Sequence, residues 1–422
     1  MRKVLGFLLC FFIICSSLAF KPIEKASSEL QVVKIDASTK EERTKISSLG
    51  VSIEEVYDHY IVGFCHEKEL AKLSKQGFNF RVQSLPAFLL DFPPSDSAFH
   101  NLKELNDEIL ALSQTYASIM TLSSIGKSVE GKDLTMIRIS GPQNKEGEKQ
   151  AIIFLGTHHA REHLSTEVPF YLTKYLVENY GKDEKVTQLI DEREIWIIPL
   201  VNPDGTDYDV KGNKPYKWWR KNRQGKGAGS VYGVDLNRNY GYKWGGEGAG
   251  DSQDSETYRG ETAFSEPETQ AVKTFIEAHP NITTLLTYHT FSELILYPWG
   301  HQYDSIEDQK ALRVHEVMAQ TMGRMTGYKP QQSSDLYITS GDTTDWSFGE
   351  HGIISFTFEL YPASLWEGGF YPPASVIQDV VNNNIPSALY LIDYADNPYR
   401  VLSGMKPRDF LTVSDVWPPR LH

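Results

Sequence analysis

Cysteine is scarce in this sequence, with only three among 422 residues. Cys10 and Cys15 lie in the apolar amino-terminal stretch, and Cys65 has no partner once that stretch is removed, so a disulfide framework is excluded. An exported chain without disulfides must be stabilised by its core, which is more usual for bacterial than for eukaryotic secretion. With 40% hydrophobic residues, a chain of this length can bury a large core in two folded units.

Positive charge is also in deficit, because the formal net charge is −13. Nucleic acids and anionic membrane surfaces are bound by basic surfaces. The composition therefore excludes both as partners and favours a soluble protein.

Long hydrophobic runs are absent apart from residues 4–15. This run follows Arg2 and Lys3 and ends near Ser17-Leu18-Ala19, the pattern of a signal peptide with a small-residue cleavage site. It is shorter than the ~20 residues of a membrane-spanning helix. We expect residues 1–19 to be removed and the protein to be secreted without a membrane anchor.

Residues 20–90 have the pattern of a small two-layer α/β unit. Strands are expected at 30–35, 60–65 and 78–83, and helices at 39–49 and 67–74. Residues 86–97, rich in Pro, Ser and Asp, read as an exposed linker with a processing site near Leu90 and Asp91, although an ordinary interdomain linker has the same composition.

Residues 91–396 alternate buried-type strands with helices, which predicts a mostly parallel, mixed sheet with helices on both faces. Strands are expected at 134–139, 151–155, 194–201, 283–288 and 353–360. Helices are expected at 102–116, 166–180, 266–278 and 310–325. Residues 245–255 read as a long surface loop, and residues 397–422 as a carboxy-terminal extension.

A metal site is indicated at the end of the strand at 151–155. His159 and Glu162 are three residues apart on a turn leading into a helix, so both can point at one ion. His289 ends the strand at 283–288 and supplies a third ligand, and two His with one Glu are an established set for catalytic Zn²⁺. His158 and His163 compete for the same role, and the spacing alone is a weak signal.

Several further motifs accompany this spacing in a fixed order. They are His159-Ala160-Arg161-Glu162, Trp219-Arg220-Lys221-Asn222-Arg223, Gly233-Val234-Asp235-Leu236-Asn237-Arg238-Asn239, Tyr288-His289-Thr290, Leu336-Tyr337-Ile338-Thr339-Ser340-Gly341-Asp342, Asp345-Trp346-Ser347 and Phe356-Thr357-Phe358-Glu359. Over nearly all of residues 91–396 the chain resembles the zinc carboxypeptidases of the A/B type, and among them most the bacterial carboxypeptidase T branch. The resemblance implies an eight-stranded sheet and one catalytic zinc ion per chain.

The same resemblance implies catalytic roles for Glu359 and Arg220. Glu359 would be the general base that takes a proton from water, whereas by itself it could be a surface glutamate at a strand end. Arg220 would stabilise the oxyanion, although a basic stretch such as 217–223 is usually a solvated face.

Recognition of substrate is implied for five other residues. Asn237 and Arg238 would bind the free terminal carboxylate, with Arg161 at the rim and Tyr337 as a mobile cap. Asp342 would meet a basic side chain, while the neighbouring threonines leave room for apolar ones, so mixed specificity is expected. Asp235 would orient His159.

The remaining expectations concern partners and alternatives. The substrates would be peptides or proteins with a free C-terminus, and the enzyme would be monomeric. Residues 20–90 would be a propeptide removed by an activating protease, or else a permanent accessory domain. The acidic residues of one loop are candidates for structural Ca²⁺: Glu247, Asp251, Asp254 and Glu256. A cell-wall peptidase cutting γ-glutamyl links and a noncatalytic binding protein remain as alternative functions.

Overall fold

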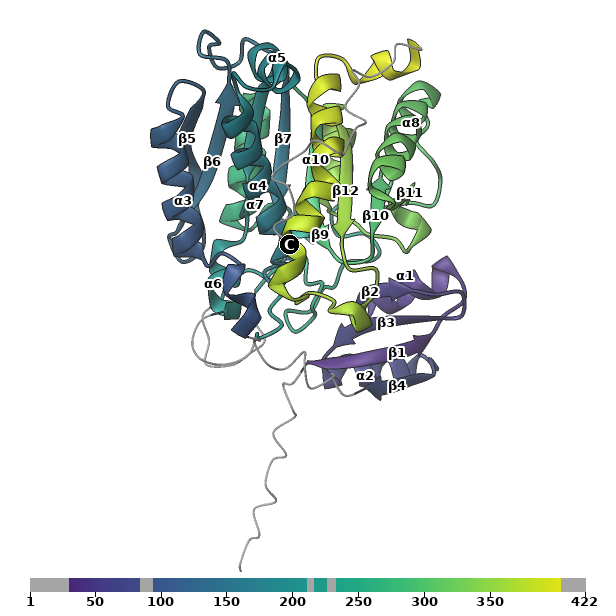
Figure 1. Ribbon diagram of the computed structural model, residues 1–422. Coiled ribbons are helices and arrows are strands. Elements are labelled where there is room, and N and C mark those ends of the chain that lie inside the picture. The colour runs from purple at the N-terminus through teal and green to yellow at the C-terminus, as the bar shows by residue number, and fades with distance from the viewer. Residues whose placement is uncertain (1–29, 84–93, 211–215, 226–232, 404–422) are drawn as a thin grey trace, which may run out of the picture.

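The computed structural model describes residues 30–83, 94–210, 216–225 and 233–403. The expected signal peptide, the expected processing site near Leu90 and Asp91, and most of the expected carboxy-terminal extension lie outside these ranges. Two sheets are present, one at the amino terminus and one in the main body (Figure 1). No helix in the described ranges is long and apolar enough to span a membrane.

The amino-terminal unit is a four-stranded antiparallel sheet with two helices, in the strand order β2-β3-β1-β4. Its elements are β1 (Gln31–Asp36), α1 (Lys40–Ser48), β2 (Ser52–Val56), β3 (Tyr60–Cys65), α2 (Glu67–Lys75) and β4 (Phe80–Gln83). Thr39 and Glu42 form a capping box that begins α1. The unit has a core of its own, which includes Val33, Ile46 and Leu73. Of its strands only β2 was not predicted, and β2 is the one that reaches the site described below.

The main sheet has eight strands in the order β11-β10-β12-β9-β7-β8-β6-β5. They are β5 (Met120–Lys127), β6 (Asp133–Ser140), β7 (Ala151–Gly156), β8 (Glu194–Ile198), β9 (Ile282–Thr290), β10 (Leu294–Tyr297), β11 (Lys329–Gln332) and β12 (Ile354–Leu360). The four central strands β12, β9, β7 and β8 are parallel. β10 and β11 form a fourth parallel pair, and the other three pairings are antiparallel. The predicted mixed, mostly parallel sheet is confirmed.

Helices cover both faces of this sheet (Figure 1). One face is packed by α3 (Leu102–Thr115), α4 (Leu164–Asn179), α5 (Glu184–Glu192), α8 (Gln309–Thr326) and α10 (Ile377–Tyr394). The other is packed by α7 (Pro267–Ala278) and α9 (Thr343–His351), which share a second apolar cluster with the sheet. The helix α6 (Pro203–Val210) follows β8.

Residues just beyond the expected domain end remain part of the fold. A 3-10 helix at Pro398–Ser403 lies against α8. Its Arg400 forms ion pairs with Asp393 at 3.0 Å and Asp396 at 2.8 Å. The ordered main body therefore continues past residue 396.

The amino-terminal unit lies at the end of the main sheet where β9 and β12 terminate (Figure 1). Its strand β2 is hydrogen-bonded there, since Tyr337 Oη donates to the Ile53 carbonyl at 3.1 Å and Ser292 Oγ to the Glu54 carbonyl at 3.0 Å. The loop 245–255, expected to be exposed, is partly covered by this unit, because the Gly248 amide donates to Ser48 Oγ at 2.9 Å. The edge at which active sites form in such sheets is therefore covered.

Candidate active site

His159, Glu162 and His289 converge in a buried cluster at the carboxyl ends of β7 and β9. His159 Nδ1 lies 2.7 Å from Glu162 Oε1, and His289 Nδ1 lies 3.1 Å from Glu162 Oε2. The two Nδ1 atoms lie 3.1 Å apart. In the described part of the chain this is the one group of three His, Cys, Asp or Glu side chains placed to hold a metal ion. Two imidazoles and a carboxylate are the donor set of catalytic Zn²⁺, so these residues fit that ion.

Electrostatics favour cation binding at this cluster. Burial alone would raise the pKa of Glu162, but His159 and His289 outweigh it and lower that pKa well below its ordinary range. Burial lowers the pKa of His289. Metal binding requires an ionised carboxylate at Glu162 and a neutral imidazole at His289, and these are the states that the two shifts favour.

His158 and His163, which compete with His159 in the sequence, have other partners. His158 Nε2 lies 2.9 Å from the Tyr240 hydroxyl, and burial lowers the pKa of His158 well below 6.5. His163 Nε2 lies 3.0 Å from Asp209 Oδ2. Both histidines are structural and outside the cluster.

Asp235 joins the metal cluster to Arg220. Its Oδ1 lies 3.0 Å from His159 Nε2, which leaves Nδ1 to face the cluster, as the resemblance implied. Its Oδ2 accepts hydrogen bonds from Arg220 Nε and Nη2 at 3.0 and 2.9 Å. Burial would raise the pKa of Asp235, but Arg220 and His159 hold it well below its ordinary value. A fully buried carboxylate thus fixes the side chains of both His159 and Arg220.

Arg220 lies beside the cluster, with Nη1 3.9 Å from Glu162 Oε1. It lines the central pocket. Its double hydrogen bond to Asp235 was not predicted, because fourteen residues separate the two in the sequence and show no pairing signal. The arrangement presents the remaining face of the guanidinium to the pocket.

Glu359 stands directly beside His289, since the two are register partners on the parallel strands β12 and β9. It also lines the pocket. Burial, together with the negative charges of Glu162 and Glu54, raises the pKa of Glu359 well above 4.5. A carboxyl group next to a metal ligand and facing the same pocket is suitably placed for proton transfer.

Asn237 and Arg238 also line the pocket, in a 3-10 turn begun by Asp235. Asn237 Oδ1 accepts hydrogen bonds from the Thr343 amide and hydroxyl at 3.0 and 2.8 Å, which fixes the orientation of its side chain. Arg238 Nε donates to the Gly248 carbonyl at 3.1 Å. Both side chains are therefore preorganised donors at the pocket wall.

Asp342 lines the pocket together with Thr339 and Thr344. It caps α9 by accepting a hydrogen bond from the Asp345 amide at 2.8 Å, and it also accepts from both threonine hydroxyls at 2.9 Å. Burial and then Asp345 raise the pKa of Asp342 to about 6. The side chain thus serves the helix as well as the pocket.

Arg161 was expected at the rim, and with the amino-terminal unit in place its side chain is completely buried. Its guanidinium lies 2.9 Å from Glu54 of the amino-terminal unit and 2.9 Å from Glu256. It also packs against the rings of Phe64 and Phe370. The covering by β2 explains the difference, since the sequence alone does not show that a separate unit contributes side chains here.

The acidic loop expected to bind calcium is also occupied by protein cations. Glu256 pairs with Arg161 and with His66, and Asp254 pairs with Lys68 at 2.5 Å. Within the described residues, the loop forms no cluster of acidic ligands that could hold an ion. Its charges instead hold the amino-terminal unit.

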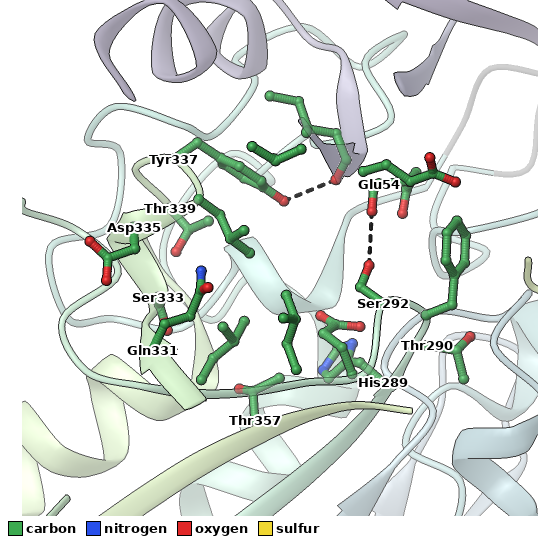
Figure 2. Close-up of a pocket in the computed structure, with 18 of the residues that line it drawn as sticks. Glu54, His289, Thr290, Ser292, Gln331, Ser333, Asp335, Tyr337, Thr339 and Thr357 are labelled. Atoms are coloured by element: carbon green, nitrogen blue, oxygen red, sulfur yellow. Dashed lines mark hydrogen bonds between the residues drawn. The ribbon is translucent and has the colours of Figure 1, made fainter. Parts of the chain in front are cut away.

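A pocket of about 790 Å³ connects the His–Glu–His cluster with Arg220, Glu359 and Asp342, and residues of both units line it. Figure 2 shows Tyr337 and Ser292 directed at β2, with Glu54 above His289. Ser292, Thr357 and Glu54 were missed in the sequence. Proximity to His289 and the alternation of β12 are signals for the first two, whereas Glu54 has no such signal.

The fold and the His–Glu–His cluster define a metal-dependent hydrolase of the α/β class. A family model described as zinc carboxypeptidase matches residues 105–387, which is more than half of the chain. The chain belongs to this zinc carboxypeptidase family and is a metallocarboxypeptidase that uses Zn²⁺.

Individual relatives agree with this assignment. A zinc carboxypeptidase of Saccharothrix mutabilis subsp. capreolus is 31% identical over 408 residues, covering 90% of this chain and 93% of the relative. Carboxypeptidase A1 of Bos taurus is 30% identical over 306 residues, covering 71% of each chain. The crystal structure of carboxypeptidase A from Helicoverpa armigera shares the fold, with a TM-score of 0.71, 23% identity, and coverage of 89% of this chain and 98% of that one.

Proposed function

We propose that the enzyme removes the C-terminal residue from peptides and proteins, with Glu359 as general base and Arg220 as oxyanion donor. Bound Zn²⁺ supplies a water molecule whose pKa is lowered to about 7. Glu359 accepts a proton from the attacking water and returns it to the leaving amine. Arg220 donates hydrogen bonds to the carbonyl oxygen as negative charge develops on it. The observation that carries this proposal is the register pairing of Glu359 with His289 in a pocket that Arg220 also lines.

Exopeptidase action follows from the far wall of the pocket. Asn237 and Arg238 bind the terminal carboxylate, which restricts productive binding to a chain end. Tyr337, once β2 is removed, closes over the bound residue through its hydroxyl. Asp342 accepts basic terminal side chains, while Thr339 and Thr344 leave space for apolar ones. We propose a broad preference for basic and hydrophobic C-terminal residues.

The amino-terminal unit acts as an inhibitory propeptide in this proposal. Its strand β2 binds Tyr337 and Arg161, two residues to which we assign substrate binding. Glu54 of the same strand lines the pocket. Cleavage near Leu90 and Asp91 by an activating protease would release it. Secretion after removal of residues 1–19, which the sequence pattern above supports, gives a monomeric extracellular bacterial enzyme that stays inactive during export.

The test is a mass-spectrometric time course with peptides ending in Arg, Lys, Leu, Phe, Glu or Pro. The mature enzyme should trim single residues from the free C-terminus and leave the amidated forms intact. Glu359→Gln should retain zinc and lose turnover. Cleavage of muropeptides in preference to all of these peptides would support the γ-glutamyl peptidase alternative, and zinc binding without any cleavage would support a noncatalytic protein.

A further inference from the structure

Two buried glutamates at the start of α7 converge on the side chain of Asn222. Asn222 Nδ2 donates hydrogen bonds to Glu266 Oε2 at 2.7 Å and to Glu268 Oε2 at 3.1 Å. All three side chains are at most 1% exposed. Among the described residues, no Lys, Arg or His forms an ion pair with either glutamate. Ser265 Oγ also donates to Glu266 Oε1 at 2.7 Å, so neutral groups supply the hydrogen bonds to the pair. Two buried carboxyl groups without a cationic partner among the described residues are costly to maintain, which indicates a role beyond packing.

The other polar atoms of Asn222 join two segments of the active site. Its Oδ1 accepts a hydrogen bond from the Val234 backbone amide at 2.8 Å, and the backbone amide of Asn222 donates to the Val234 carbonyl at 3.0 Å. Gly233 has φ of +102°, and a Cβ atom there would lie 2.3 Å from the Asn222 carbonyl oxygen. The close approach of the two segments therefore requires glycine at position 233.

These two segments carry the catalytic pair described above. Arg220 lies two residues before Asn222, and Asp235 follows Val234 directly. We propose that Glu266 and Glu268 are positioning residues, which orient the Asn222 amide so that Asn222 holds Arg220 and Asp235 in register. This inference rests on the proposed role of Arg220 in the reaction.

The charge state of the pair agrees with this geometry. Burial raises the pKa of Glu268 to about 7 and also raises the pKa of Glu266. Glu261 adds negative charge near Glu266, while the Val129 amide donates to Glu268 at 3.1 Å. The lysines of the adjoining segments are engaged elsewhere: Lys132 with Asp204 and Asp207, and Lys221 with the carbonyls of Gln253 and Ser255. Both carboxyl groups therefore bind protons more readily than exposed glutamates do.

The test compares Asn222→Ala with a matched control, Asn281→Ala, in the mature zinc enzyme. Asn281 makes the same kind of bond, from Nδ2 to the buried Glu194 at 2.9 Å, but at the start of β9. Asn222→Ala should lower kcat by about tenfold with little change in KM, because a small displacement of Arg220 weakens transition-state binding. Asn281→Ala should lower the Tm and leave kcat unchanged. Equal kcat in both variants would overturn the inference.

Two further variants separate the possible failures. Arg220→Ala should lower kcat by about 10²-fold, and if it does not, the proposed mechanism fails rather than the positioning inference. Glu268→Gln keeps the shape of the side chain and tests the inference if Asn222→Ala does not fold; the kcat of this variant should fall several-fold.

Because Glu268 holds its proton to higher pH in the folded state, the stability of the wild type should decline between pH 4.5 and about 7, and this decline should be smaller in Glu268→Gln. An unchanged pH slope and an unchanged kcat would overturn the proposal.

Discussion

Arg161 and Glu54 form a buried ion pair, 2.9 Å apart, that joins the main body to the amino-terminal unit. Arg161 is fully buried and is held on its other side by Glu256. A cationic residue expected to contact substrate is thus neutralised by a carboxylate from β2. The amino-terminal unit therefore lines part of the pocket and pairs with the charge of Arg161.

Glu54→Ala should therefore raise the basal activity of the full-length chain before cleavage. Loss of a charge-assisted hydrogen bond at a buried site costs about 1.5–3 kcal/mol, and Arg161 retains Glu256, so a rise of roughly 10- to 100-fold is expected. The measurement is peptide hydrolysis by the uncleaved protein. The control is Lys68→Ala, which removes an exposed ion pair with Asp254 across the same interface and should have little effect. Equal activation by both variants would contradict a specific role for Glu54.

Docking of the amino-terminal unit should weaken as the pH rises through the neutral range. His66 lies 3.4 Å from Glu256 across the interface; burial would lower its pKa, but Glu256 outweighs burial and raises the pKa above 6.5. Glu69 also raises this pKa, whereas Lys221 lowers it. Protonated His66 stabilises docking fully below pH 6.5, and this contribution is lost as the pH passes the raised value.

The measurement is the basal activity of uncleaved protein between pH 5.5 and 8.5, relative to that of the mature enzyme at each pH. The ratio should increase with pH in the wild type and should be flatter in His66→Gln. His59→Gln, which changes an exposed histidine of the same unit, should behave like the wild type. A pH-independent ratio in the wild type would show that His66 does not contribute to docking.

Several elements of the fold were predictable because the pattern of apolar residues within each segment shows which of its side chains are buried. The strands β7, β9 and β12 and the helices α3 and α8 were predicted from apolar runs, alternation or helical periodicity, and their predicted ends differ from the structure by at most two residues. The eight-residue strand β5 was missed. The strands β10 and β11 have only four residues each and were missed. Their pairing depends on neighbours far away in the sequence, which a short window does not contain.

The candidate site was likewise predictable only in part. The cluster of His159, Glu162 and His289 was predictable because two ligands are close in sequence and the third ends a neighbouring strand. The burial of Arg161 was not, because Glu54 belongs to a separately folded unit. Local motifs therefore identify the reacting groups, while the contacts that restrain them depend on docking and on loops from distant segments.

Removal of zinc should destabilise the protein in proportion to its affinity for the metal. Chelation leaves Glu162 and two imidazoles buried together without a cation, and a ligand present at about 1,000 times its Kd stabilises by about 4 kcal/mol. The melting temperature should fall on addition of a chelator and recover with Zn²⁺. His289→Ala should show a low melting temperature that a chelator does not change. A chelator effect that persists in this variant would place the metal elsewhere.

Asp342→Asn should shift specificity away from basic C-terminal residues. Asn keeps the cap of α9 because its Oδ1 still accepts from the Asp345 amide, so the fold is preserved while the charge is lost. We expect kcat/KM for peptides ending in Lys or Arg to fall about tenfold, equivalent to about 1.4 kcal/mol, with Leu and Phe little affected. Asp335→Asn, which changes a more exposed acid lining the same pocket, should leave kcat/KM unchanged for both basic and apolar C-terminal residues.

Because burial and Asp345 raise the pKa of Asp342 to about 6, the wild-type preference for Lys over Leu should decline as the pH falls through 6, and Asp342→Asn should lack this dependence. A Lys-to-Leu ratio that is the same in wild type and Asp342→Asn at pH 7.5 would exclude Asp342 as the determinant of basic specificity.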